Sequence, residues 1–311
     1  MLKEAIFSAY ARTGTARAVW AIRAGRLRIL SYHGVCEDRH EGQDWVPPYF
    51  VTASLFESHL HYLKQNASVL TLGHAVHRLK DGTLPGRTVA ITFDDGYANN
   101  LHVAVPLLKR YSLQATIFVS TGIVESQDFF TFHKLTYLER RGFRPPKSYK
   151  KDSLAVVESS IADMWSEAKS SIPAEQYNSL RAMTVDELKR IPLDLIELGS
   201  HTHGHVILRN ENRQTRDSEI LTSIARIKEW TGIPVQTFSY PNGLSGDFDS
   251  GDKEVLRSAG VRGAVSAIAG SNGRATDVLE LRRYPITMNH DLNTFIAELT
   301  GFRAFLKRIA S

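Results

Sequence analysis

The sequence predicts an α/β fold with a mostly parallel sheet, which is either doubly wound or closed into a barrel. Short apolar runs rich in β-branched residues recur along the chain, and segments with helical periodicity lie between them. No internal repeat or low-complexity tract interrupts this alternation. In both arrangements, residues that carry chemistry are expected at the carboxyl ends of the strands.

The predicted strands are short, apolar runs typical of a buried parallel sheet. They cover residues 28–32, 88–93, 115–119, 195–198, 235–239 and 263–266, and a later strand is expected around Arg283.

Two segments between these strands show helical periodicity. Residues 54–65 place apolar side chains at helical spacing, and Ile220, Ile224 and Ile227 form a second apolar stripe. Gly232 follows this stripe and can end its helix, because glycine readily adopts left-handed backbone angles.

The segment from about residue 126 to 182 is longer, more polar and more charged than the other connections. We predict a helical insertion here, which either walls one side of a groove or forms a solvated helical pair. The chain is expected to return to the alternating pattern with a helix that opens at Val185. Thr184 and Glu187 form a capping box there, in which each side chain bonds the other residue's backbone N–H.

A helical segment, residues 1–27, is expected ahead of a single domain, residues 28–311. The uncharged run 5–11 is seven residues long, whereas a membrane helix needs about 20. It also lacks a clear signal-peptide cleavage site. We therefore expect neither a transmembrane helix nor a signal peptide.

Arginines at positions 12, 17, 23, 26 and 28 lie among aromatic and aliphatic residues of this N-terminal region. Two hypotheses follow: a basic amphipathic helix that lies on an anionic membrane surface, or a helix packed on the domain. The expected location is the cytoplasm or the inner membrane face, as a peripheral protein.

The charge balance is weakly basic, with 38 Lys+Arg against 33 Asp+Glu and a net charge of +5 over 311 residues. It suits an anionic glycan or membrane surface. No clustered basic helix with interleaved aromatic residues appears, so no nucleic-acid partner is expected. The single Cys36 excludes an intrachain disulfide and a zinc ribbon.

Two acidic residues, Asp94 and Asp95, follow the predicted strand 88–93 within the sequence TFDDG. Adjacent carboxylates raise each other's pKa unless a cation or a proton separates their roles. Gly96 permits a tight turn that keeps both at the strand tip. The alternative is a turn in which an Asp caps the following helix.

Three histidines, His201, His203 and His205, follow another predicted strand within five residues. Neutral imidazoles are good ligands for Zn²⁺ and similar metals. With one carboxylate of the acidic pair, two of these histidines would make a His₂-Asp site with open positions for water and substrate.

TFDDG at 92–96 together with HTHGH at 201–205 resembles the motifs of the polysaccharide deacetylase family, also called the NodB homology domain or carbohydrate esterase family 4. The resemblance extends from Tyr32-His33-Gly34 to Arg283. It implies a distorted (β/α) barrel and a metal-dependent hydrolase that removes N-acetyl groups from an amino-sugar-containing polysaccharide or oligosaccharide. A carbohydrate O-acetyl esterase and a non-catalytic, metal-containing glycan-binding protein are the alternatives.

The resemblance also implies roles for individual residues. Asp95, His201 and His205 would hold a divalent metal, and Asp94 would be the base that takes a proton from the attacking water. His203 falls between the ligand positions. Zn²⁺ is the favoured metal, with Co²⁺, Mn²⁺ and Ni²⁺ as alternatives.

The sequence departs from the family's R-x-P-Y motif, because Ser239 stands where the motif has its arginine. We predict that Arg283 supplies the missing cation, with Arg282 as the fallback. The backbone N–H of Asn242 can still serve as the oxyanion donor, since every residue except proline has one.

The histidine that protonates the leaving amine has two candidates. His290 has the usual late position in the chain but lacks an apolar strand before it. His33 ends the predicted strand 28–32, and a closed sheet can place the first and last strands side by side. We predict His33. Tyr97, Trp45 and Tyr49 are candidates for stacking on a sugar ring.

Overall fold

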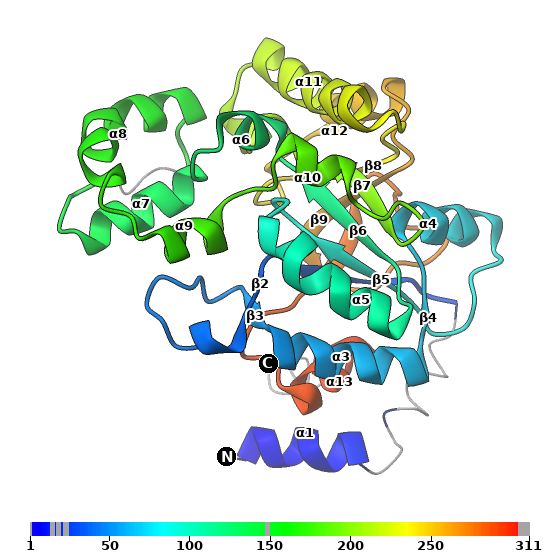
Figure 1. Cartoon of the computed structure of the whole chain (residues 1–311). Helices are drawn as coiled ribbons and strands as arrows, with labels where there is room; N and C mark the ends of the chain where they lie inside the picture. The colour runs from blue at the N-terminus through cyan, green and yellow to red at the C-terminus, as the bar shows by residue number, and fades with distance from the viewer. Residues whose placement is uncertain (1, 13–15, 17–19, 21–24, 147–149, 304–311) are drawn as a thin grey trace.

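The computed structural model describes residues 2–12, 16, 20, 25–146 and 150–303 (Figure 1). Within these residues, seven parallel strands form a closed ring in the order β1-β10-β9-β8-β7-β6-β5, and β5 pairs again with β1. The short strand β4 (Ser68–Val69) extends the sheet outside β5. The sheet is therefore a closed barrel, as the family resemblance implied.

The barrel strands are almost entirely buried, because the ring interior covers one face and helices cover the other. Every residue of β1, β5 and β6 is buried. The strands are β1 (Arg28–Tyr32), β5 (Thr88–Phe93), β6 (Ala115–Val119), β7 (Ile196–Ser200), β8 (Thr237–Ser239), β9 (Gly263–Ala269) and β10 (Leu281–Pro285).

Helices surround the ring where the sequence alternates between strand and helix patterns. The capping box of Thr184 and Glu187 is present at the start of α10, and Gly232 ends α11 with a φ angle of 73°. The surrounding helices are α3 (Ala53–Asn66), α5 (Val105–Tyr111), α6 (Thr121–Ser126), α10 (Val185–Lys189), α11 (Arg213–Thr231), α12 (Ser250–Ser258) and α13 (Leu292–Thr300).

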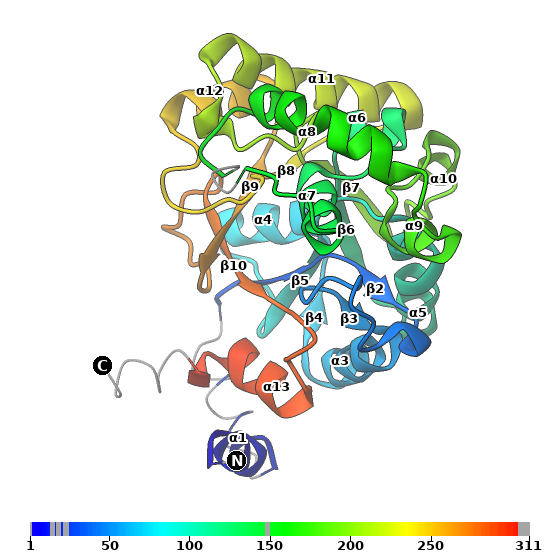
Figure 2. The ribbon, with the colours of Figure 1, turned by 90° about the vertical axis from the view of Figure 1, so that its left-hand side faces the viewer.

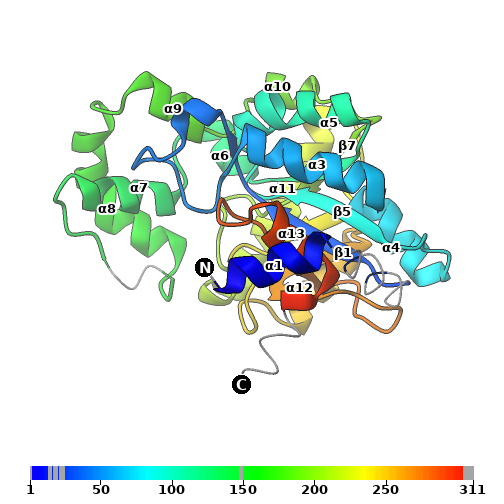
Figure 3. The same ribbon diagram turned by 90° about the horizontal axis from the view of Figure 1, so that it is seen from below.

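Three helices, α7 (Thr131–Arg140), α8 (Leu154–Lys169) and α9 (Ala174–Leu180), lie between β6 and β7 in the chain. Figures 1 and 3 show them projecting to one side of the barrel. Buried Phe129, Leu138 and Ile161 belong to an apolar cluster that also includes Phe50 and Tyr97 from outside these helices. The three helices therefore pack through apolar side chains and are not a fully solvated pair.

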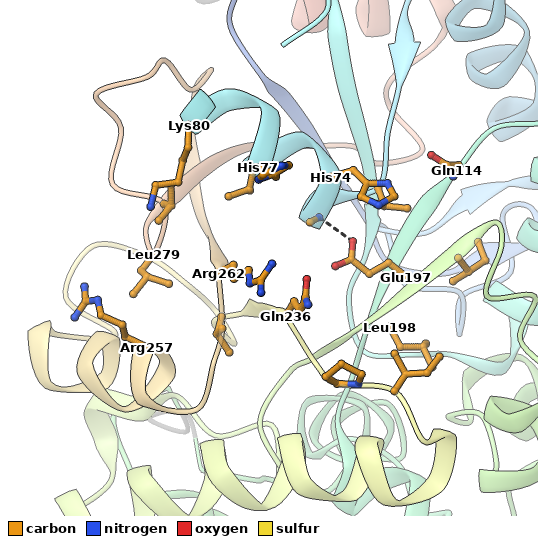
Figure 4. Close-up of a pocket in the computed structure, with 18 of the residues that line it drawn as sticks. His74, His77, Lys80, Gln114, Glu197, Leu198, Gln236, Arg257, Arg262 and Leu279 are labelled. Carbon is orange, nitrogen blue, oxygen red and sulfur yellow. Dashed lines mark hydrogen bonds between the residues drawn. The ribbon is translucent and has the colours of Figure 1, made fainter. Parts of the chain in front are cut away.

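Helix α4 (Leu72–Asp81) packs at the amino end of the barrel. Glu197 accepts a hydrogen bond there from the N–H of Gly73 at 2.9 Å (Figure 4). It also accepts hydrogen bonds from the hydroxyls of Thr116 and Thr237 at 3.0 and 3.1 Å. A Cβ on residue 73 would lie 2.7 Å from the carboxylate of Glu197, so a side chain there would displace this carboxylate. A groove of about 960 Å³ borders this end, away from the motif residues.

Helix α1 (Leu2–Arg12) packs against α13, as Figure 2 shows. Tyr10 donates a hydrogen bond to Thr300 at 2.9 Å and stacks on Phe302. The side chains of arginines 12, 17 and 23 lie outside the described residues, so the predicted membrane contact stays a prediction. Arg28 is not part of a basic surface, because it is buried within β1. No helix in the described ranges is long and apolar enough to cross a bilayer.

Candidate active site

The two motif segments lie at the same end of the barrel, because both follow parallel strands. Asp94 and Asp95 come directly after β5, and residues 201–205 come directly after β7. Oδ1 of Asp95 is 3.5 Å from Nε2 of His201 and 3.2 Å from Nε2 of His205. The three potential ligand atoms lie within 4.8 Å of one another. The structure therefore brings together the three residues assigned to a metal from the sequence.

Three residues of this cluster have backbone conformations that residues other than glycine rarely adopt. Asp95, Thr202 and His205 have φ angles of 72°, 62° and 61°. Such conformations are typical of functional sites, where the surrounding structure enforces them. Neither Asp94 nor Asp95 accepts a hydrogen bond from a backbone N–H of a described residue, so the helix-capping alternative is not observed.

The hydrogen bonds of His201 show which of its ring nitrogens can bind a metal ion. Its Nδ1 lies 2.7 Å from the carbonyl oxygen of Ser239, so Nδ1 carries a proton that it donates. In a neutral ring, Nε2 then presents a lone pair toward the carboxylate of Asp95, and two acceptors face each other. A cation between them removes this conflict. Two ligands, each about 2.0–2.1 Å from a tetrahedral Zn²⁺, are about 3.3 Å apart, which agrees with the observed spacing.

His203 takes no part in this cluster. Its Nδ1 lies 2.9 Å from the hydroxyl of Thr121, and its backbone is bonded to Gly122 and Glu219. The middle histidine therefore fastens the loop to α6 and α11.

Asp94 lies beside the cluster but contacts different partners. Its Oδ1 accepts a hydrogen bond from Arg283 at 2.7 Å, and its Oδ2 accepts one from Ser31 at 3.3 Å. Burial would raise the pKa of Asp94, but the positive charge and the hydrogen bond of Arg283 oppose this effect and the pKa is lowered to about 2. Asp94 is thus an ionised, hydrogen-bonded carboxylate at neutral pH.

Arg283 reaches Asp94 from β10, which is separated from β5 in the ring by β1. Its side chain is 3% exposed and also donates to Ser239 at 3.1 Å and to the carbonyl of Ser266 at 2.8 Å. Arg282, the fallback candidate, is exposed because neighbouring residues of a strand face opposite sides.

His33 follows β1 and lies on the other side of Asp94, with Nε2 3.9 Å from Oδ2. Its side chain is partly exposed to the groove described below. His290 lies in the connection from β10 to α13, where it is bonded to Thr287 and Arg303. It does not line that groove.

Asn242 follows β8 and has a φ angle of 58°. Its backbone N–H donates to no residue in the described part of the chain, while its side chain bonds Asp247 at 2.6 Å. Since Asn242 also lines the groove, this N–H is available to a bound oxygen atom.

A groove of about 440 Å³ runs over these residues. Trp45 and Tyr49 from the connection between β2 (Val35–Cys36) and β3 (Val51–Thr52) line one part of it. The expectation that Tyr97 stacks on a sugar is wrong, because its ring is completely buried against Phe50 and Phe130.

Ser31, Phe132 and His133 also line the groove but were not predicted from the sequence. Phe132 and His133 open the helical insertion, in a run of three phenylalanines and one histidine within residues 129–133. This dense aromatic run at the start of a polar segment could have been used to predict that these residues line the groove. The contact of Ser31 with Asp94 depends on strand register, which no local pattern reveals.

Comparison with known proteins agrees with this geometry. Residues 81–264 match the sequence model of the polysaccharide deacetylase family, a range that includes Asp94, Asp95, His201 and His205. A stretch of 97 residues is 36% identical to the poly-beta-1,6-N-acetyl-D-glucosamine N-deacetylase of Staphylococcus aureus. This match covers 31% of the chain and 32% of that relative, so it spans about a third of either protein.

Two solved structures share the fold over most of the chain. The deacetylase PplD of Streptococcus pyogenes, in complex with acetate, aligns with a TM-score of 0.64 at 18% identity, over 88% of this chain and 98% of its own. IcaB from Ammonifex degensii aligns with a TM-score of 0.59 at 20% identity, over 88% of this chain and 97% of its own. With the motif residues gathered at one end of the barrel and more than half of the sequence matched, the chain belongs to the polysaccharide deacetylase family.

Proposed function

We propose that this protein is a metal-dependent hydrolase that removes N-acetyl groups from an amino-sugar-containing polysaccharide or oligosaccharide. The observation that carries the proposal is the arrangement around Asp94. An ionised carboxylate, held by Arg283, lies next to a His₂-Asp cluster at the floor of an open groove. A hydrolase needs this combination of a base, a metal site and room for substrate.

Asp95, His201 and His205 would hold the divalent metal, which would polarise the acetyl carbonyl and lower the pKa of a bound water. Asp94 takes the proton of the attacking water, and its hydrogen bond to Arg283 keeps the carboxylate oriented for this transfer. The donor set suits Zn²⁺, and Co²⁺, Mn²⁺ or Ni²⁺ are alternatives.

Two further groups would act on the substrate. The backbone N–H of Asn242 donates to the carbonyl oxygen as negative charge develops on it. His33, 3.9 Å from Asp94, donates a proton to the nitrogen of the sugar as the C–N bond breaks. The products are acetate and the free amino sugar.

The substrate class rests on two kinds of support. The groove carries the partly exposed aromatic residues Trp45 and Tyr49, whose rings can pack on sugar faces. The Staphylococcus aureus relative is named for poly-beta-1,6-N-acetyl-D-glucosamine, although the match covers only a third of it. We therefore propose an N-acetylglucosamine-containing glycan.

The test is acetate release by the metal-loaded protein from an N-acetylglucosamine oligomer and from acetylated xylan, measured side by side. Release from the oligomer supports N-deacetylation, and release from xylan alone would instead assign an O-acetyl esterase. The Asp94→Asn variant serves as the matched control, since it changes one oxygen for nitrogen. A fully metal-loaded wild type that is as inactive as this control on both glycans would leave only a glycan-binding role.

A further inference from the structure

His133 is a nearly buried histidine that the helical insertion places in the wall of the active-site groove. It belongs to the first turn of α7, is 6% exposed and lines the groove. Its ring lies 6.5 Å from that of Tyr49 and 4.6 Å from that of Phe132, measured between centroids. No role described so far uses this imidazole.

One side of the ring is fixed by Tyr97. Nε2 of His133 lies 2.8 Å from the hydroxyl of Tyr97, and this hydrogen bond is buried. Tyr97 follows the TFDDG sequence, so the bond joins the insertion to the loop that carries Asp94 and Asp95. The ring therefore has a set position relative to the catalytic residues.

The other ring nitrogen, Nδ1, makes no hydrogen bond to any described residue and is not a fully buried atom. Burial lowers the pKa of His133 to about 3, so the imidazole is neutral at working pH. A neutral ring has one donor and one acceptor, and with Nε2 occupied, Nδ1 offers one hydrogen bond to the groove.

The segment that carries His133 also touches the metal-ligand cluster. The rings of Phe130 and Phe132 each lie 5.3 Å from the ring of His205, measured between centroids. A sugar whose acetyl group lay at Asp95 and His205 would therefore have its ring or its neighbouring unit within reach of this wall.

We infer that His133 is a substrate-binding residue, whose Nδ1 hydrogen-bonds a hydroxyl or acetamido group of the glycan while Tyr97 holds the imidazole in place. This inference rests on the proposed function and deepens it, since it assigns the insertion a part in substrate recognition. A hydrogen-bonding site discriminates strongly against analogues that lack the partner group. The insertion would thus help to select which glycan is accepted.

The experiment measures kcat and KM for an N-acetylglucosamine oligomer with three variants. His133→Phe keeps a flat ring but removes the hydrogen bond, so we expect KM to rise about tenfold and kcat to change by less than about threefold. His133→Asn keeps a polar group near Nδ1 and should recover part of the loss. His74→Phe makes the same exchange at an exposed position of α4, at the far end of the barrel, and should leave KM unchanged.

An unchanged KM in His133→Phe, or an equal fall of kcat in both His133 variants, would overturn the inference. Binding of the oligomer to the metal-loaded Asp94→Asn protein, with and without His133→Phe, separates this result from the fate of the proposed function. Loss of binding in the double variant supports the role of His133 even if the wild type proves inactive. Equal binding by both proteins contradicts it.

Discussion

The guanidinium of Arg283 donates a hydrogen bond to the hydroxyl of Ser239 at 3.1 Å while it also binds Asp94 at 2.7 Å. Ser239 stands where the family's R-x-P-Y motif has its arginine. The small serine leaves room for a guanidinium that arrives from β10, and its hydroxyl helps to hold that group. Arg283 thus places a cation beside Asp94 from β10, at the position for which the sequence analysis predicted one.

Removal of this cation should cost most of the activity. We expect Arg283→Gln to lower kcat/KM on the order of 100-fold, because Asp94 would lose its orienting hydrogen bond. Metal content should stay at the wild-type level, since Arg283 contacts none of the three metal-ligand candidates. Arg282→Gln on the exposed face of the same strand is the matched control, and an equal loss in both variants would contradict the assignment.

Elemental analysis of variants should distinguish the proposed base from the proposed metal ligands. Asp94→Asn should retain the metal and lower kcat by roughly 10²- to 10⁴-fold. His201→Ala should lose the metal, because it removes one of three clustered ligands. His203→Ala, which alters the histidine bonded to Thr121, should keep it. Full metal occupancy in His201→Ala would remove this residue from the ligand set.

The free energy of unfolding should decrease as the pH falls, and protonation of His59 should be one cause. Its Nε2–H donates to the carbonyl of His290 at 2.8 Å and its Nδ1 accepts from Tyr32 at 3.0 Å, so the native ring is neutral. Burial lowers its pKa to about 3, although the His290 carbonyl opposes the shift. The unfolded chain takes up this proton below about pH 6.5, and the native protein does not until about pH 3.

The free energy of unfolding should therefore decline as pH falls between about 6.5 and 3, with up to about 1.4 kcal/mol per pH unit from each such histidine. Buried His133 contributes in the same direction. His59→Gln keeps a donor for the His290 carbonyl but does not titrate, so its stability should fall less steeply. Denaturant unfolding at pH 5 and pH 8 measures both slopes, and parallel slopes would contradict the assignment.

Gly199 in β7 should not tolerate a side chain. A Cβ there would lie 2.5 Å from the ring of Phe118 and 2.8 Å from the hydroxyl of Thr237. We expect Gly199→Ala to destabilise the protein by about 1–3 kcal/mol. Gly86→Ala is the control, because a Cβ at residue 86 meets nothing within 4 Å. Equal melting temperatures of the two variants would show that the barrel repacks around residue 199.

The sequence predicted the ring strands well where whole runs are apolar. β1, β5 and β6 begin and end at the predicted residues. The predicted strand 235–239 is too long, since β8 starts only at Thr237. The first two residues of that run, Val235 and Gln236, belong to the preceding loop. Periodicity does not show where a strand begins after one apolar and one polar residue.

Helices α4, α12 and α13 were not predicted. α4 is polar on its exposed face, with His74, His77 and Lys80, and its apolar residues pack beneath the barrel rather than around it. A local pattern shows that a face is apolar but not which surface it meets. The same limit explains Tyr97, whose burial depends on Phe130 from the distant insertion.

The motif residues of the candidate site could be predicted from the sequence, because the carboxyl ends of parallel strands lie at one edge of the sheet. Arg283 was predicted because a cation was missing from its usual motif. His133 was not, since its role depends on an insertion that folds back on the groove. The groove wall is formed by segments that are far apart in the sequence, and no local pattern shows that these segments meet.

The double pairing of β1, with β5 on one side and β10 on the other, also brings together the two residues of the Asp94–Arg283 pair. Asp94 and its arginine are 189 positions apart, and the arginine arrives on the last strand of the ring. A chain truncated before β10 would keep the three metal-ligand candidates but would lack the hydrogen-bond partner of Asp94. Closure of the ring and completion of this ion pair are therefore a single structural event.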